Sequence, residues 1–283
     1  FINSYFIFFS LVFFVKSLLL IKVRPILIAL TLPIIVISVD MLIWPRFILS
    51  DMIYAFLVLY VTHFIIRGII IDRINYLKLF IIIFLLFASR PSSIPVVVAI
   101  MLFIVISKFQ IFLKQKNILL FVLAIFISIP FVLGLAYLII EINFSGIAKI
   151  DFLTDMVKKG MIIHDRPETW ISKPDNFIDI LFIYFLRLIN FFNPYASTFS
   201  ILHISLNVIQ ISIILLSISI WSFFGSHIKI YNKIFLFILL LSFSVAAFHS
   251  FILIDYDWRY RFPIILPMLM LLPISLEIIL KKK

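Results

Sequence analysis

Long apolar runs separated by short polar breaks are the dominant pattern of this sequence. Runs of roughly 17 to 25 residues recur, and lipid can be crossed only by helices or closed barrels. A barrel would show short strands of alternating polarity, and the sequence has no such pattern. We therefore predict an all-α integral membrane protein, a polytopic helical bundle with about nine spans. The predicted spans are residues 3–21, 25–43, 52–71, 76–90, 93–110, 118–140, 201–224, 232–254 and 261–280.

One long polar segment, residues 141–200, divides these spans into two groups. We expect a first transmembrane part over residues 1–140, a loop region outside the membrane over 141–200, and a second transmembrane part over 201–283. Within the loop region, residues 177–192 have the pattern of an amphipathic helix at the membrane interface. Asp175, which follows a proline, is the predicted N-cap of that helix.

Composition agrees with a membrane protein and excludes a soluble globule. The chain is 65% hydrophobic and 13% charged, with a mean hydropathy of +1.27. It contains no cysteine, which excludes disulfides and thiolate metal sites. The sequence begins at Phe1 within an apolar run, and we expect that it is truncated at the N-terminus.

The net charge of +11 indicates orientation in the membrane and does not indicate nucleic-acid binding. The basic residues fall between spans and form no nucleic-acid motif. On one face of the predicted bundle the acids are Asp72 and Glu277 alone. The basic residues of that face are Lys16, Lys22, Arg24, Arg67, Arg73, Lys78, Lys108, Lys114, Lys116, Lys229, Lys233 and Lys281 to Lys283. We expect this face in the cytoplasm, and the loop region and the functional face outside an inner (plasma) membrane.

The densest polar motif is DYDWRYRFPIILP, residues 255–267, at the start of the last predicted span. One interpretation is a functional site. The other is a membrane-interface belt in which Trp258 and Tyr260 lie at headgroup depth and arginines bind lipid phosphates. The candidate site residues are Asp257, Arg259, Tyr260 and Arg261.

A second candidate region is SVDMLIWPRFILSD, residues 38–51. Asp40 lies within a predicted span, where an ionisable group costs about 2.5–3.5 kcal/mol on insertion scales and is a functional candidate. Asp51 opens the next helix, so its carboxylate is either a helix cap or a site residue. Arg46 is a candidate phosphate ligand, or the structural partner of either acid.

A tight turn, ASRPSSIP, follows the fourth predicted span at residues 88–95. Pro91 and Pro95 interrupt the helices there. The turn places Arg90 at the outer interface, where a guanidinium can bind a phosphate with two hydrogen bonds. The alternative is that Arg90 extends towards lipid headgroups.

The loop region contains HDRPETW, residues 164–170. Its carboxylates suit sugar hydroxyls, Trp170 suits the apolar face of a pyranose, and His164 is a further candidate. A solvated loop has much the same composition. His164, Asp165 and Glu168 are also candidates for a divalent cation, although their spacing matches no metal signature.

Two histidines lie within predicted spans, and a lone histidine there is more often a packing residue than a ligand. His249, near the outer end of its span, is a better site candidate than His63. The sequence has no Walker loop, Rossmann glycine pattern or HExxH motif, so nothing supports nucleotide-driven transport.

Several of these stretches together resemble polyprenyl-phosphate-dependent GT-C glycosyltransferases of the family 39 (protein mannosyltransferase-like) type. Residues 31–60 resemble the part of that family in which a proline-containing span leads to an arginine and then to an acid that opens a helix, here Arg46 and Asp51. The turn at 88–95 places Arg90 in the family's basic position.

The motif at 255–267 resembles the family's C-terminal signature of an arginine and a tyrosine followed by spaced prolines. Arg259, Tyr260 and Pro263 match it best, and Arg261 is the alternative arginine. The order of the motifs along the chain also agrees with that family.

The resemblance implies a GT-C-like fold and a hexosyltransferase that moves a sugar from a polyprenyl-phosphate donor to an extracytoplasmic lipid, glycan or protein acceptor. An acid before Phe1 would act as the base, with Asp40 and Asp51 as the catalytic candidates of this chain. Arg90 and the two motif arginines would neutralise the leaving lipid phosphate. A divalent cation is a candidate cofactor.

Two other functions remain open from the sequence. One is a flippase or transporter of lipid-linked saccharides, and the other is an O-antigen polymerase or ligase. The expected partners are the lipid-linked donor, the acceptor and membrane lipids, without nucleic acid.

Overall fold

The regular elements of the computed structural model are helices, as expected for an all-α membrane protein. The structure describes residues 2–38, 49–90, 93–109, 115–144, 148–164, 166–195, 199–224, 228–252 and 260–282. Its elements are α1 (Ile2–Leu20), α2 (Pro25–Val36), α4 (Leu49–Ile71), α5 (Tyr76–Ser89), α6 (Ile94–Phe109), α7 (Gln115–Phe144), α8 (Ala148–Lys158), η3 (Pro167–Thr169), α9 (Phe177–Asn190), α10 (Ile201–Phe224), α11 (Lys229–Phe251), α12 (Phe262–Leu269) and α13 (Leu271–Lys282).

Five stretches of the described residues are long and apolar enough to cross a membrane. They are Asn3–Leu20, Asp51–Ile71, Ile201–Phe224, Lys229–Phe251 and Phe262–Lys281. Four further apolar helices are shorter over the described residues. At ~1.5 Å per residue, α2 and α5 extend about 18 and 21 Å, less than the ~30 Å of a bilayer core. The helical membrane class is therefore supported, whereas the count of nine spans stays a prediction.

Prolines decide where several helices begin and break. Pro25 opens α2, where its missing N–H and fixed φ cost nothing. The last predicted span, 261–280, is present as the apolar stretch Phe262–Lys281, in which the single residue Met270 separates α12 from α13. Pro267 and Pro273 flank the break, and neither can donate the backbone hydrogen bond that a continuous helix needs.

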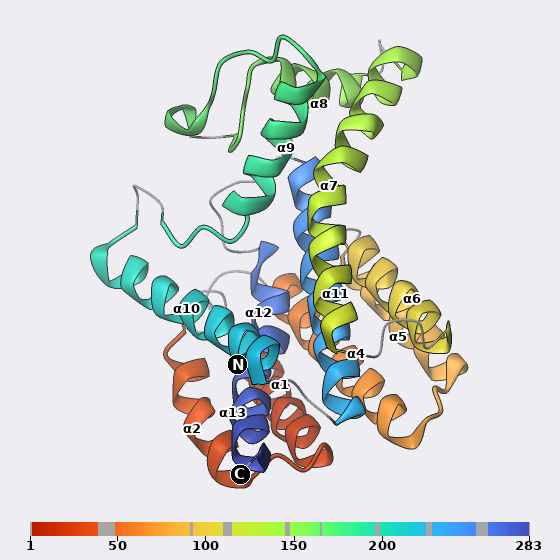
Figure 1. Ribbon diagram of the computed structural model, residues 1–283, viewed down its shortest axis with the longest axis vertical. Helices are drawn as coiled ribbons and strands as arrows, with labels where there is room; N and C mark the ends of the chain where they lie inside the picture. Colours follow the sequence, from red (N-terminus) through yellow and green to blue (C-terminus); the bar gives the residue numbers. More distant parts are fainter. Residues whose placement is uncertain are drawn as a thin grey trace.

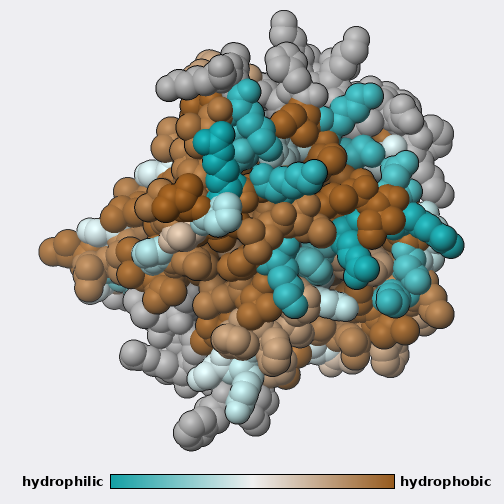
Figure 2. Space-filling view, turned by 90° about the horizontal axis from the view of Figure 1, so that it is seen from below, coloured by the Kyte–Doolittle hydropathy of each residue, from teal (hydrophilic) through white to brown (hydrophobic). Residues whose placement is uncertain are grey.

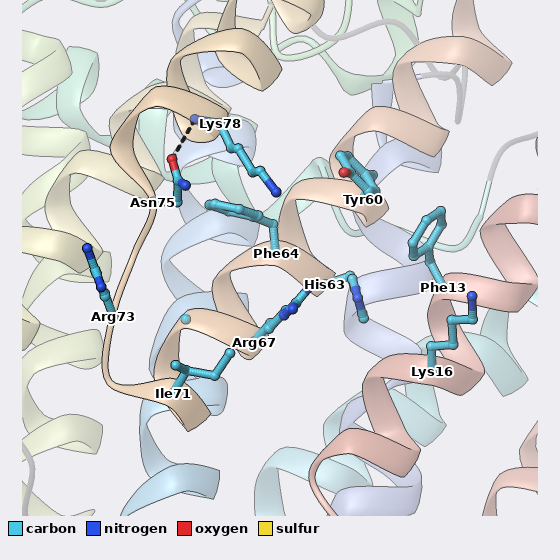
Figure 3. Close-up of a pocket in the computed structure, with 11 residues that line it drawn as sticks. Phe13, Lys16, Tyr60, His63, Phe64, Arg67, Ile71, Arg73, Asn75 and Lys78 are labelled. Atoms are coloured by element: carbon cyan, nitrogen blue, oxygen red, sulfur yellow. Dashed lines mark hydrogen bonds between the residues drawn. The ribbon is translucent and has the colours of Figure 1, made fainter.

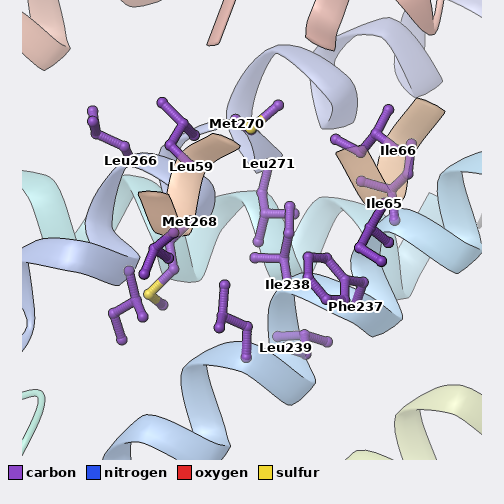
Figure 4. Packing of buried hydrophobic residues seen from close by; sticks show 14 of the residues in the cluster. Leu59, Ile65, Ile66, Phe237, Ile238, Leu239, Leu266, Met268, Met270 and Leu271 are labelled. Carbon is purple, nitrogen blue, oxygen red and sulfur yellow. The ribbon is translucent and has the colours of Figure 1, made fainter. Parts of the chain in front are cut away.

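Helices α11, α12 and α13 form the centre of the bundle (Figure 1). The α11 span is 72% buried and the α12–α13 span 83%, whereas the α1 and α10 spans are each 22% buried and so have wide faces for lipid. Helices α4, α6, α7 and α12 pack against α11. Figure 4 shows the packed side chains, among them Leu59, Ile65 and Ile66 of α4, Phe237, Ile238 and Leu239 of α11, and Met268, Met270 and Leu271 at the α12–α13 break.

The loop region contains α8, η3 and α9, which lie at the end of α7 (Figure 1). The predicted amphipathic helix is present as α9. Its N-cap is Asn176 rather than the predicted Asp175: the Asn176 side chain accepts from the Asp179 N–H at 3.1 Å, and the Asp179 carboxylate accepts from the Asn176 N–H at 3.3 Å. This reciprocal pair satisfies two free N–H groups of the first turn, so it decides the start of the helix.

A buried arginine and a glycine fix α9 to the end of α8. Arg187 is 1% exposed, and its Nε and Nη2 donate to the Met161 carbonyl at 2.9 and 2.5 Å. Burial lowers the pKa of Arg187 to about 10. The turn that presents this carbonyl needs Gly160, whose φ is +70° and whose added Cβ would lie 2.3 Å from the Ile171 carbonyl oxygen.

Candidate functional site

An ion pair with a fully buried carboxylate joins the beginning of α4 to the end of α5. Asp51 lies in the first turn of α4 and is fully buried, and Arg90 Nη1 donates to its Oδ1. Arg90 follows α5 as its C-cap in an extended conformation. Because α4 and α5 are consecutive, packed helices, the start of one meets the end of the other. The helix dipole at the start of α4 also favours the carboxylate at this position.

Two tyrosine rings lie against the Arg90 guanidinium. Its Cζ is 5.4 Å from the ring centre of Tyr260 and 5.9 Å from that of Tyr54. Both distances are in the range of cation–π attraction, which is strongest where water is excluded. Tyr54 is three residues after Asp51, so one face of α4 carries both contacts. The guanidinium is thus held in orientation by a carboxylate and two rings.

His249 extends this cluster towards α9. Its ring centre is 4.4 Å from that of Tyr260, and its ring stacks on Phe191 at 5.8 Å. Arg261, the next residue after Tyr260, is 4% exposed and donates to the Asn193 carbonyl at 2.7 Å. Asp51, Tyr54, Arg90, His249 and Tyr260 are referred to below as the Asp51–Arg90 cluster.

The structure therefore brings together three sequence-predicted site residues from distant parts of the chain: Asp51, Arg90 and Tyr260. A fourth, Arg261, adjoins them in sequence. Five other predicted site residues lie outside the described residues, namely Asp40, Arg46, Asp165, Asp257 and Arg259.

His164 and Trp170 make their contacts within the loop region. The His164 ring lies 6.1 Å from that of Phe152, and Trp170 Nε1 donates to the Ile163 carbonyl at 2.9 Å. The predicted cation ligand Glu168 is 3.8 Å from Arg166. Among the described residues, no three His, Asp or Glu side chains converge in a way that would hold a metal ion.

Tyr54 is the member of the cluster that the sequence analysis missed. The sequence could have indicated Tyr54, because it lies one turn after Asp51 on an otherwise apolar helix, where a tyrosine hydroxyl needs a hydrogen-bond partner. His249 had been weighed as the better of two intramembrane histidines, and the structure places it beside Tyr260.

An apolar cavity of about 470 Å³ lies near Arg261. Asn193, which accepts the Arg261 hydrogen bond, is one of its lining residues. The other lining side chains come from the end of α9 and from α10, α11 and α12, among them Phe192, Ile214 and Met268. An apolar chain could therefore lie in the cavity while an anionic group attached to it lies near Arg261.

The chemistry available to the cluster is anion recognition by an oriented guanidinium. An arginine carries five N–H donors, so the bond to Asp51 leaves donors for a further anion. Because Asp51 is fully buried, it can influence an anion only through Arg90 and not by direct contact. Donors fixed in a water-poor site stabilise negative charge more strongly than the same groups in water.

No family model matches the chain, and no curated protein or solved structure is similar to it beyond chance.

Proposed function

We propose that the protein is an integral membrane glycosyltransferase of GT-C type, which transfers a sugar from a polyprenyl-phosphate donor to an extracytoplasmic lipid, glycan or protein acceptor. The observation that supports this proposal is the convergence of Asp51, Arg90 and Tyr260 in one buried cluster. These residues come from the three sequence stretches that resemble that family. The protein would lie in the plasma membrane with this cluster towards the outer face.

In the proposed reaction an acceptor oxygen attacks the anomeric carbon of the sugar, and the bond from that carbon to the lipid phosphate oxygen breaks. The phosphate leaves with additional negative charge, which Arg90 and Arg261 neutralise. The acceptor proton passes to a carboxylate base, for which Asp40 is the candidate in this chain. Asp51 is a positioning residue that holds Arg90 towards the phosphate. Charge neutralisation by Arg90 and Arg261 needs no metal ion, and a divalent cation would add to it.

The apolar cavity beside Asn193 supports a lipid-linked donor, because it can take part of a prenyl chain while Arg261 lies at the phosphate end. The loop region would cover the sugar and the acceptor, with His164 and Trp170 as contacts. Covering the site would exclude water, which otherwise competes with the acceptor hydroxyl.

The test is release of polyprenyl phosphate from a labelled polyprenyl-phosphate sugar by purified protein in detergent. Arg90→Ala is expected to lower the rate about 100-fold or more, as loss of one preorganised donor to a developing anion does. Asp51→Asn should lower it as well, mainly through kcat. Arg24→Ala, which removes an arginine 51% exposed at the other end of the bundle, is the matched control and should leave the rate unchanged. Full turnover by Arg90→Ala would reject the proposed role.

A flippase or transporter of lipid-linked saccharides is the second candidate. It is favoured by the fact that, in the described part of the chain, the carboxylate of the cluster is already paired with Arg90 and is not free to act as a base. Vesicles containing the protein would then move labelled lipid-linked saccharide across the bilayer without releasing polyprenyl phosphate. The same two variants would reduce that movement.

A further inference from the structure

A pocket with four cations lies at the opposite end of the bundle from the Asp51–Arg90 cluster. It has a volume of about 430 Å³, and its lining includes Phe13 and Lys16 of α1, Tyr60, His63, Phe64 and Arg67 of α4, Arg73 and Asn75 of the α4–α5 connection, and Lys78 of α5 (Figure 3). This set is called the basic pocket below. Asp51 and Arg67 are about 24 Å apart along α4 at ~1.5 Å per residue, so the two sites are distinct. Figure 2 views the molecule from this end, where hydrophilic side chains gather.

Three other basic residues near this end of the bundle have an acidic neighbour. Arg24 and Lys281 lie 3.6 and 3.5 Å from Glu277, and Lys233 lies 4.0 Å from Asp72. Among the described residues that line the basic pocket there is no acidic side chain. Four positive charges from four consecutive or neighbouring segments therefore line one space without a carboxylate among the described lining residues.

The surroundings of the pocket are suited to an amphiphile. Phe13 and Tyr60 pack edge to face, with ring centres 4.9 Å apart, and the His63 ring lies 5.1 Å from Phe13. The Ser17 hydroxyl lies 2.9 Å from His63 Nδ1, which fixes that ring. Next to Lys78, α5 exposes Leu77 and Phe80 by 71% and 68%. The cations thus lie between an aromatic wall and an apolar, lipid-type surface.

We propose that the basic pocket binds a phosphate-bearing group with two or more negative charges, such as a diphosphate or a pair of linked phosphates. Four cations around one space repel each other, and an anion of matching charge removes that repulsion. Basic pockets between membrane helices recognise phosphate headgroups for this reason. The group is carried either by a membrane lipid or by a soluble compound, and both present the same chemistry to these side chains. This site does not depend on the proposed function.

The experiment compares purified full-length protein with the double variant Lys16→Gln/Arg67→Gln. The soluble arm titrates inorganic pyrophosphate in detergent by calorimetry. The lipid arm measures the thermal unfolding midpoint in phosphatidylcholine nanodiscs that contain either cardiolipin or phosphatidylglycerol at equal total charge. The matched control is Lys22→Gln/Lys229→Gln, which removes two exposed lysines that do not line the pocket.

We expect the pocket variant to weaken binding about 30-fold, because each of the two charges removed contributes about fivefold near a membrane surface. The control variant should bind as the unchanged protein does. A higher midpoint in cardiolipin than in phosphatidylglycerol, lost in the pocket variant alone, supports a lipid headgroup. Pyrophosphate binding lost in the same variant, without lipid preference, supports a soluble phosphate compound.

Equal binding by the pocket and control variants would overturn the proposal, as would the absence of binding in both arms. Sugar transfer is a separate readout. If the pocket variant loses phosphate binding but still releases polyprenyl phosphate, the pocket is a binding site that is independent of sugar transfer. If neither protein releases polyprenyl phosphate, only the proposed function fails.

Discussion

The two polar ends of the bundle differ in the burial of their charged side chains and in whether the fold supplies a partner for them. In the Asp51–Arg90 cluster the carboxylate is fully buried and paired, and Arg261 nearby is 4% exposed and bonded to a carbonyl. In the basic pocket Lys16 and Arg67 are exposed, and no acid is among the described lining residues. A buried charge needs a partner from the fold, because its desolvation is costly. An exposed cation does not, so it remains available to an anion from outside.

The largest expected effect is at the buried end. Asp51→Asn leaves Arg90 with no charged partner, and removing one member of a buried pair typically costs about 3–5 kcal/mol. The free energy of unfolding in detergent, from a denaturant titration, measures this loss. The double variant Asp51→Asn/Arg90→Gln should recover part of it, because no unpaired charge remains. A loss below about 1 kcal/mol in the single variant would show that this end behaves like the exposed one.

A smaller loss is expected at Arg187, which is more deeply buried than Arg90 and is bonded to a carbonyl rather than to a carboxylate. Arg187→Met keeps most of the apolar volume and leaves the Met161 carbonyl without its donor, at a cost of about 1–3 kcal/mol. Hydrogen exchange of α8 and α9 should increase while that of α11 stays slow, because the contact is local. Unchanged exchange in α8 and α9 would mean that burial of this arginine contributes little to the loop region.

Lys158 and Glu141 form an ion pair near the surface, with 2.8 Å between Nζ and Oε1. Its contribution to stability should lie between that of the Asp51–Arg90 pair and that of the cations in the basic pocket. Lys158→Met should cost less than about 1 kcal/mol, since solvent screens such pairs. The hydrogen bond to Glu141 raises the pKa of Lys158, so the folded state holds this proton more tightly than the unfolded state. The stabilisation is therefore complete near neutral pH and declines as pH rises through the raised pKa. A pH series of unfolding midpoints for both proteins checks this. The midpoint difference should be largest near neutral pH and shrink at high pH, and a difference that grows as pH rises through the raised pKa would contradict the prediction.

The smallest effect, with the opposite sign, is expected in the basic pocket. Without added anion, Lys16→Gln should change stability by no more than about 0.5 kcal/mol, and should increase it, because repulsion from Arg67 is relieved. The measurement is thermal unfolding in a detergent without phosphate. Clear destabilisation would mean that Lys16 has a structural partner, and the contrast between the two ends would fail.

The sequence predicted helix positions well where an apolar run alone decides them. The predicted spans 52–71, 201–224 and 232–254 match α4, α10 and α11 closely, because the length of the run fixes the helix. The last span, 261–280, is likewise present as Phe262–Lys281, but its interruption at Met270 was not predicted from the apolar run. The predicted cap of α9 was wrong, because a reciprocal bond between Asn176 and Asp179 decides the start of that helix. Asn176 and Asp175 are both good caps, so composition could not choose between them.

The candidate site was predictable residue by residue but not as an arrangement. Asp51, Arg90 and Tyr260 were each singled out because they are polar at the ends of apolar runs. Their ion pair and ring contacts depend on how α4 packs against α5 and α12, which periodicity does not specify. Tyr54 illustrates this limit, since its role follows only from its contact with Arg90.

The division at Met270 gives the two polar ends a soft mechanical connection. Helix α12 starts beside Tyr260 and Arg261, whereas α13 carries Glu277, which is tied to Arg24 and Lys281. Because Pro267 and Pro273 lack the N–H that would stiffen a single rod, bending is easiest between those two anchorages. We therefore expect bending of the last span to tilt α12 relative to α13 while each end keeps its own contacts.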